Sequence, residues 1–254
     1  LSSATLSNNI FEAAIKNNYF STYYYADNAV ITAENNVIKL ANRGSNAIRI
    51  SNVTNSNVTF NLNDNSYEFS DASGSSEYEG FIILQDFSTG SAVQDFSKVT
   101  LNIKGLTTPD DATRLLYVYD DQDGIIQTNQ PVVKGDSSIE KFFVAKVGDT
   151  YYKTLAEAID AASDGATITL LKDVTGMAVI PSGKTVTIDL SGHTITRTVT
   201  SGENSKIYPA LYVNGGTLTL DDTSEGKTGR VLSEITDTTV SGAMSNAVYV
   251  ISGA

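Results

Sequence analysis

The stretch KTLAEAIDAASDGATITLL, residues 153–171, decides the fold, because its hydrophobic period changes from that of a helix to that of a strand. Its first half carries apolar side chains at helical spacing, namely Leu155, Ala158, Ile159 and Ala162. Thr154 with Glu157 three residues later predicts a capping box. Gly165 is expected to end the helix in a left-handed conformation. We therefore predict a short amphipathic helix over residues 154–164 that covers an apolar surface.

Strand-like alternation follows this helix. Ile168 and Leu170 alternate with threonines, and the apolar positions of TVTIDL (185–190) and TLTLDD (217–222) repeat the pattern at offsets of 18 and 32 residues. A second unit, PALYVNGG at 209–216, returns as NAVYVISG 37 residues later. Short strands that recur with loops of variable length favour a β-solenoid, in which each coil needs stacked neighbours to bury its apolar face.

The order of these elements is similar to that in a known family of proteins. VGDTYYKTLAEAIDAASDGATITLLKDV, then IPSGKTVTIDLSGHTIT, then ALYVNGGTLTLDD resembles the start of right-handed parallel β-helix regions in large surface proteins of Gram-positive gut bacteria. The resemblance covers about residues 144–254. It implies that the helix caps the first coil and that the protein lies outside the cell. It implies fold and location far more than chemistry.

The N-terminal part is predicted to be a β-rich domain over residues 1–140, followed by the β-helix domain over residues 141–254. Asn9–Phe20 is expected to form an entry helix. Strands are expected at NAVITA, NVIKLA, NAIRISN, NVTFNLN, GFIILQDF, KVTLNIKG and RLLYVYDD. NVTFNLND and KVTLNIKG are offset by 41 residues, which favours an irregular solenoid. A β-sandwich is the alternative, since it also has short strands at regular spacing. The fold class is therefore all-β.

Composition limits the partners. The net charge is −12, so nucleic acid is not expected as a partner, and neither is an anionic membrane surface. The chain has no cysteine, which excludes thiolate metal sites and cysteine nucleophiles. No apolar run has the length of a membrane span, so no membrane insertion is expected in this segment. The chain begins at Leu1 and shows no signal peptide, so we interpret it as a processed or trimmed chain whose export signal has been removed.

The segment DLSGHTI raises the question of catalysis, because Asp189 lies four residues before the only histidine, His193. If Ile188 and Leu190 point inward, Asp189 points outward and His193 lies on a partly exposed turn. An acid near a histidine does not make a catalyst without a placed nucleophile or substrate. We therefore interpret the motif as a turn, in which Asp189 accepts N–H bonds and Gly192 permits the bend.

Other acidic residues suggest weaker sites. The Asp120–Gly124 loop resembles a calcium loop but fails the EF-hand pattern, so a plain Asp-Gly turn is favoured and a Ca²⁺ site is the alternative. The paired acids are Asp110-Asp111 and Asp221-Asp222. The best enzymatic constellation joins Asp189 and Asp222 on neighbouring coils, with Arg197 or Arg230 nearby. The sequence assigns no catalytic, cofactor-binding or metal-ligating residue.

Two surfaces remain as candidates for binding. Tyr23, Tyr24 and Tyr25 form either an aromatic core layer or a sugar-stacking platform, and the core layer is favoured. The final strand AVYVIS is apolar, so Val248, Val250 and Ile251 are expected to be covered. Either the chain is a fragment whose next coils follow Ala254, or the edge pairs head-to-tail with another copy.

The expected function is an extracellular structural or adhesive one, as a stalk, a filament subunit or a module that binds host glycan or protein. A polysaccharide lyase or glycoside hydrolase on a β-helix is the alternative. No cofactor is expected.

Overall fold

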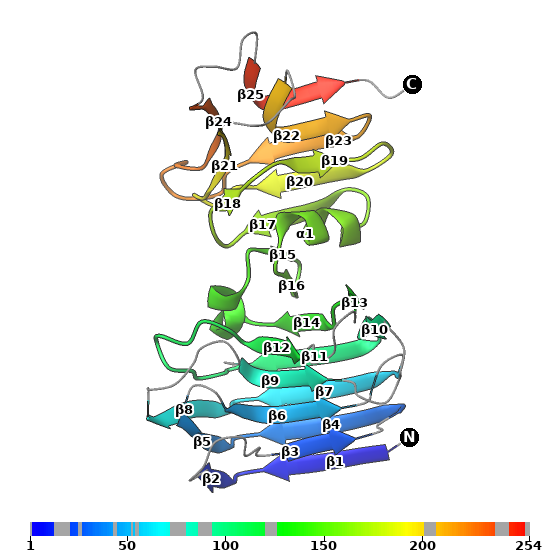
Figure 1. The fold of residues 1–254 in the computed structure, drawn as a ribbon, viewed down its shortest axis with the longest axis vertical. Coiled ribbons are helices and arrows are strands. Elements are labelled where there is room, and N and C mark those ends of the chain that lie inside the picture. Colours follow the sequence, from blue (N-terminus) through cyan, green and yellow to red (C-terminus); the bar gives the residue numbers. More distant parts are fainter. Residues whose placement is uncertain are drawn as a thin grey trace. The chain divides into compact units, whose positions relative to one another are not determined.

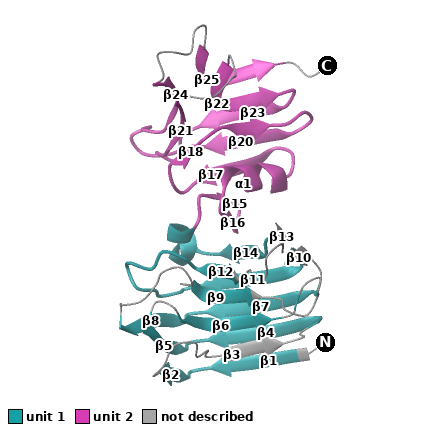
Figure 2. Ribbon diagram, viewed as in Figure 1, with its two compact units in different colours: residues 1–142 teal, residues 143–254 magenta. Residues whose placement is uncertain are grey.

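The computed structural model (Figure 1) describes most of the chain. The described residues are 2–12, 21–24, 27–42, 45–51, 53, 56–71, 80–85, 93–119, 126–200, 207–236 and 244–251. They divide into two compact units, residues 1–142 and residues 143–254, which Figure 2 colours separately. Both units consist mainly of short strands that pair in parallel, so the protein is all-β with a few helical turns.

Unit 1 distributes consecutive strands among different sheets. The first sheet contains β1 (Ser2–Ser7), β4 (Ala29–Glu34), β7 (Val58–Asn63), β11 (Val99–Lys104) and β14 (Val132–Gly135). The second contains β2 (Ile10–Glu12), β5 (Val37–Asn42) and β8 (Ser66–Asp71). The third contains β3 (Ser21–Tyr24), β6 (Asn46–Ser51), β9 (Gly80–Gln85) and β12 (Leu116–Tyr119), and a fourth pairs β10 (Val93–Asp95) with β13 (Ile126–Asn129). We call one set of consecutive strands, such as β4, β5 and β6, a rung.

The strand pairs described in unit 1 are parallel, whereas β-sandwiches are built from antiparallel sheets. Val99 of β11 lies opposite Val58 of β7, which is the 41-residue offset read from the sequence. The seven strands predicted in this unit are confirmed as β4, β5, β6, β7, β9, β11 and β12. Inward side chains such as Phe60 and Leu101 are fully buried, because successive residues of a strand point to opposite faces.

Two features of unit 1 differ from expectation. The helix predicted over Asn9–Phe20 is wrong in its described part, since Ile10–Glu12 form strand β2 and pair with β5, while residues 13–20 lie outside the described residues. Pairing with a neighbouring strand overrides the weak helical spacing of so short a segment. A 3₁₀-helix that the sequence did not reveal, η2 (Ser137–Phe142), buries Ile139 at the end of the unit.

Unit 2 begins with an antiparallel group and continues as parallel rungs. Its first sheet contains β16 (Thr150–Tyr152), β15 (Ala145–Val147), β17 (Ala166–Leu170), β20 (Thr185–Asp189) and β23 (Thr217–Asp221). The second contains β18 (Val174–Thr175), β21 (Thr194–Val199) and β24 (Arg230–Ile235). The third contains β19 (Ala178–Ile180), β22 (Ile207–Asn214) and β25 (Met244–Ile251). β15 pairs antiparallel with β16 and β17, and the later pairs are parallel.

The sequence repeats of unit 2 correspond to residues that lie opposite each other on paired strands. Val186 lies opposite Leu218, and Leu211 lies opposite Val248, so the offsets of 32 and 37 residues are confirmed. The 18-residue offset is wrong, because Ile168 lies opposite Ile188, 20 residues on. A slip of two residues keeps every side chain on the same face, so alternation alone does not detect it.

The predicted helix is confirmed as α1 (Leu155–Ala161), with its capping box. Glu157 N donates to Thr154 Oγ1 and Thr154 N donates to Glu157 Oε2, each at 3.1 Å. Leu155, Ala158 and Ile159 pack into the same core as strands β17 and β20. The expected role of Gly165 is wrong, because the helix already ends at the extended residue Ala162. Gly165 does adopt a positive φ of 78°, but in the turn that leads into β17.

Candidate functional site

The strongest candidate from the sequence is the turn between β20 and β21. Ser191 and Gly192 both have positive φ, 47° and 86°, and His193 N donates to Leu190 O at 2.8 Å. Two central residues with positive φ make a type I′ geometry, which Gly tolerates without strain. Leu190 and Ile195 are buried on either side of this turn, as the alternation predicts.

Asp189 occupies the position between the inward residues Ile188 and Leu190 that the alternation assigns to the outer face, but it is covered and not open to solvent. The residue is only 6% exposed, and its carboxylate accepts from Ser191 N and Thr223 N, both at 2.9 Å, and from Thr223 Oγ1 at 2.7 Å. The alternation continues to Leu190, and the turn that follows brings these donors to the carboxylate. The predicted role as an acceptor of turn N–H groups is confirmed, and it extends to the next rung.

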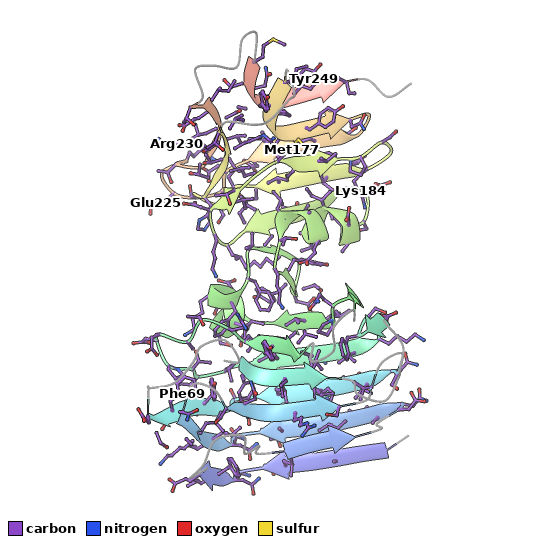
Figure 3. The ribbon with its side chains drawn as sticks, in the orientation of Figure 1. Phe69, Met177, Lys184, Glu225, Arg230 and Tyr249 are labelled. Carbon is purple, nitrogen blue, oxygen red and sulfur yellow. The ribbon has the colours of Figure 1, made fainter. Side chains whose placement is uncertain are left out.

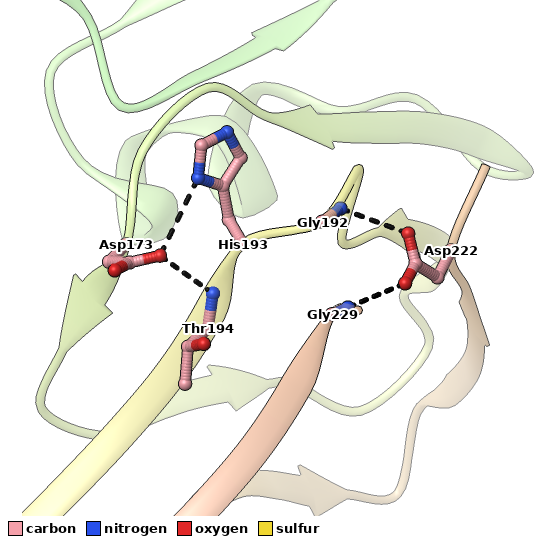
Figure 4. Close-up of polar contacts among 6 residues, drawn as sticks. All are labelled: Asp173, Gly192, His193, Thr194, Asp222 and Gly229. Atoms are coloured by element: carbon pink, nitrogen blue, oxygen red, sulfur yellow. Dashed lines mark hydrogen bonds and ion pairs between the residues drawn. The ribbon is translucent and has the colours of Figure 1, made fainter. Parts of the chain in front are cut away.

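Asp222 occupies the neighbouring turn, after β23, and bridges two rungs. Its Oδ1 accepts from Gly192 N at 2.9 Å (Figure 4). The same oxygen accepts from Ser224, at 3.1 Å from the backbone N–H and 2.7 Å from the hydroxyl. Its Oδ2 accepts from Gly229 N at 2.6 Å. Gly229 has no room for a side chain, since a Cβ there would lie 2.6 Å from Leu190 Cβ and 2.8 Å from the carboxylate. Asp222 therefore ties its own loop, residues 222–229, to the turn at Gly192 in the preceding rung.

Both carboxylates are held in the ionised form. The hydroxyl of Ser224 and the amides of Gly229, Ser224 and Gly192 lower the pKa of Asp222 to about 2, against a smaller opposing effect of burial. For Asp189, burial raises the pKa, but hydrogen bonds from Thr223 and Ser191 outweigh it, so the pKa lies below its usual range. A general acid needs the opposite shift, towards neutral pH. These two groups are suited to binding turn amides and poorly suited to donating protons.

His193 is paired with a different acid from the one that the sequence suggested. Its side chain is 34% exposed, which confirms the partly exposed turn, and Nδ1 lies 3.5 Å from Asp173 Oδ1 (Figure 4). The same oxygen accepts from Thr194 N at 2.9 Å, so Asp173 also fixes the start of β21. The two residues that made DLSGHTI look catalytic thus have different partners, Thr223 and Ser191 for Asp189 and Asp173 for His193.

The two arginines of the predicted enzymatic constellation lie in the neighbouring sheet, Arg197 on β21 and Arg230 at the start of β24. The Arg197 guanidinium lies 5.8 Å from the centre of the Tyr208 ring, and Arg230 N donates to His193 O at 3.1 Å. Asp110 and Asp111 occupy a turn in which Ala112 N donates to Pro109 O. Among the described residues, no group of three or more His, Cys, Asp or Glu side chains could hold a metal ion.

Two predicted sites lie partly or wholly outside the described residues. The Asp120–Gly124 loop falls in the undescribed segment 120–125. Tyr25 also lies outside the described residues, and of Tyr23 and Tyr24 only the backbone of β3 is described. Elsewhere, Tyr212 and Tyr249 lie opposite each other on β22 and β25, and their rings stack with centroids 5.8 Å apart. Tyr249 is labelled in Figure 3.

An asparagine ladder in unit 1 was missed by the sequence reasoning. Asn36 Oδ1 accepts from Asn9 N and Nδ2, at 3.0 and 2.9 Å, and Asn65 Oδ1 accepts from Asn36 N and Nδ2, at 3.2 and 2.9 Å. Asn36 and Asn65 are buried. Each ladder residue follows a residue with positive φ, either Asn8, Asn35 or Asp64. The recurring pairs Asn-Asn, Asn-Asn and Asp-Asn, each just before or at the start of a strand, were the available signal.

A lysine binds the free carbonyl groups at the C-terminal end of α1. Lys184 Nζ donates to Ala162 O at 2.7 Å and to Asp160 O at 3.1 Å, which are carbonyls of the last helical turn (Figure 3). A cation at this position also complements the helix dipole. Asp164 Oδ1 accepts from Thr185 N at 3.2 Å, so the loop after α1 is tied to β20. The polar residues at the turns thus connect neighbouring rungs in both units.

Within the described ranges, no helix has the length and apolar character that a membrane span requires. In comparisons with protein families, curated proteins and solved structures, nothing matches this chain.

Proposed function

We propose that the chain is a right-handed parallel β-helix over residues 141–254 and that residues 1–140 form an irregular solenoid of the same kind. Consecutive strands enter different sheets, and each strand pairs in parallel with its counterpart one rung later. The offsets of 20, 32 and 41 residues between paired strands vary because the loops vary, while the apolar positions keep their register. Solenoids of stacked rungs have this property.

We infer an extracellular role at a bacterial surface, structural or adhesive, as a stalk, a filament subunit or a module that binds host glycan or protein. This proposal rests on the hydrogen bonds that the polar turn residues form between rungs. Asn36, Asp189 and Asp222 each bind backbone groups of a neighbouring rung, so they hold rungs together. Such stacking stiffens each unit and leaves the loops free to vary.

The acidic, cysteine-free composition agrees with this location, and so does the resemblance of residues 144–254 to surface-protein β-helices. The test is localisation in the producing cells. Antibodies raised against the 254-residue chain should label intact cells as strongly as permeabilised ones, and brief treatment of intact cells with protease should remove the signal. Labelling that requires permeabilisation would contradict the proposal.

A further inference from the structure

The turn that joins β22 to β23 contains an asparagine followed by a glycine, Asn214-Gly215. This dipeptide is chemically labile, because glycine has no side chain to keep its backbone nitrogen away from the asparagine amide. Asn214 is exposed, and its side chain has no hydrogen-bond partner among the described residues. The carboxamide of Asn214 is therefore free to turn towards the backbone nitrogen that follows it.

Asn65 provides the contrast, since another small residue, Ser66, follows it. Its Oδ1 accepts from Asn36 N and Nδ2, and its Nδ2 donates to Ala33 O at 2.8 Å. These bonds fix the carboxamide within the asparagine ladder, and Asn65 is only 1% exposed. The stacked rungs thus hold the side chain of a ladder asparagine in place, whereas they leave the side chain of Asn214 unbound.

The backbone of the turn at Asn214 is held by both neighbouring rungs. Gly215 N donates to Ile251 O at 3.0 Å, and Gly183 N donates to Gly215 O at 3.4 Å. The Gly215 nitrogen can attack a carbonyl carbon only after it has lost its proton, and this proton lies in the hydrogen bond to β25. An attack on the side chain of Asn214 therefore requires the end of β25 to separate from β22.

We propose that Asn214 is a site of spontaneous deamidation whose rate is set by the separation of β25 from β22. Hydroxide removes the amide proton of Gly215, and the nitrogen forms a bond to Asn214 Cγ. The bond from Cγ to Nδ2 breaks, and the leaving nitrogen takes a proton from water and departs as ammonia. The product is a five-membered succinimide, which water opens on either side to give aspartate or isoaspartate. No oxidant or reductant takes part.

Isoaspartate at this position would disturb unit 2, because its main chain runs through the former side chain and is longer by a carbon atom. The turn is tightly packed, since a Cβ at Gly216 would lie 2.5 Å from Pro181 O and 2.8 Å from Ile180 Cγ2. The longer chain must therefore shift β22 against β19 or β23 against β20. The reaction thus makes a transient opening of this rung permanent. This inference goes beyond the scaffold role proposed above, since it needs only the pairing of β22 with β25.

Peptide mapping by mass spectrometry tests the site. The 254-residue chain is incubated in mildly alkaline buffer, either folded or unfolded in guanidinium chloride, and conversion is followed at Asn214 and Asn65. In the folded chain we expect Asn214 to react before the other described asparagines, and roughly tenfold or more slowly than in the unfolded chain. Asn214→Gln is the control for the assignment, because glutamine would have to close a less favourable six-membered ring, so position 214 should give no product.

Two substitutions on β25 test the control of the rate. Tyr249→Ala removes the ring that stacks on Tyr212 across the β22–β25 pair, and should speed deamidation in the folded chain about fivefold. Val248→Ala weakens the same pair from its inner face and replaces Tyr249→Ala if that variant does not fold. Tyr117→Ala is the matched control, since it removes a half-buried tyrosine of unit 1 and leaves β22 and β25 unchanged, so the rate should stay the same.

The outcomes separate the site from its control. A folded chain in which Asn65 or another described asparagine reacts before Asn214 would overturn the site. Equal rates at Asn214 in the parent chain and in the β25 variants would overturn the control by β25, and so would equal rates in the folded and the unfolded chain.

Discussion

Shortening Ile159 to alanine tests whether α1 seals the core of unit 2. Ile159 is 1% exposed and belongs to the cluster that includes Ile168, Ile180 and Ile188. Substitutions of this kind cost about 2–5 kcal/mol, depending on how far the cavity collapses. α1 has seven residues, and Ala158 beside Ile159 is too small to fill the gap. We expect a value of about 3 kcal/mol, in the middle of that range.

The two units need not unfold together, so a local probe is better than a single melting temperature. Hydrogen exchange of the Ile168 and Leu170 amides, followed by mass spectrometry, reports on β17 directly. A loss of about 3 kcal/mol corresponds to exchange on the order of a hundredfold faster. Asp160→Ala is the control, since Asp160 is exposed on the same helix and its replacement should change stability by no more than about 0.5 kcal/mol. Equal exchange of β17 in both variants would refute the role of α1 as a seal.

Three further predictions concern the polar turn residues. Because the folded-state pKa values of Asp189 and Asp222 are depressed below 3.8, their contribution to stability should be complete well above pH 3.8 and should be lost as the pH falls below it, for Asp222 through about 2; an acid titration monitored by circular dichroism should show this fall, and Asp222→Asn should flatten it. Asn36→Ala should destabilise unit 1 by about 1–3 kcal/mol, since it removes the hydrogen bonds to Asn9 and Leu6 and leaves the buried side-chain oxygen of Asn65 with one of its two donors; the matched substitution Asn61→Ala, at a half-buried outward site, should cost under about 1 kcal/mol, and equal losses in denaturant titrations would count against the ladder. Incubation with pectins, alginates, glycosaminoglycans or mucin glycans, with calcium added, should release no reducing ends or unsaturated products; activity that disappears in Asp189→Asn would favour the enzyme instead.

The register of the parallel strands was largely accessible from the sequence. The pairs Val58–Val99, Val186–Leu218 and Leu211–Val248 follow from matching alternating segments, because stacked rungs repeat the same inward pattern. The offset between β17 and β20 was not accessible, since a two-residue slip preserves alternation. The capping box of α1 was predictable because it is local, needing only Thr154 and Glu157.

The site was harder to predict because its geometry depends on contacts between rungs. Asp189 and His193 are close in the sequence, but Thr223 and Asp173, their actual partners, come from neighbouring rungs. Strand alternation assigns Asp189 to the outer face but does not reveal that Thr223 of the next rung binds its carboxylate there. The buried position of Asn36 is similarly non-local, since a polar residue in a turn is expected to be exposed until the ladder partner 29 residues later is identified.

Interstrand nuclear Overhauser contacts test the parallel stacking most directly. With selectively labelled valine and leucine, backbone contacts should join the segments around Val58 and Val99, around Val186 and Leu218, and around Leu211 and Val248, in the order expected for parallel strands. Contacts that instead join these segments in antiparallel order, or to strands adjacent in the sequence, would contradict the stacked-rung architecture.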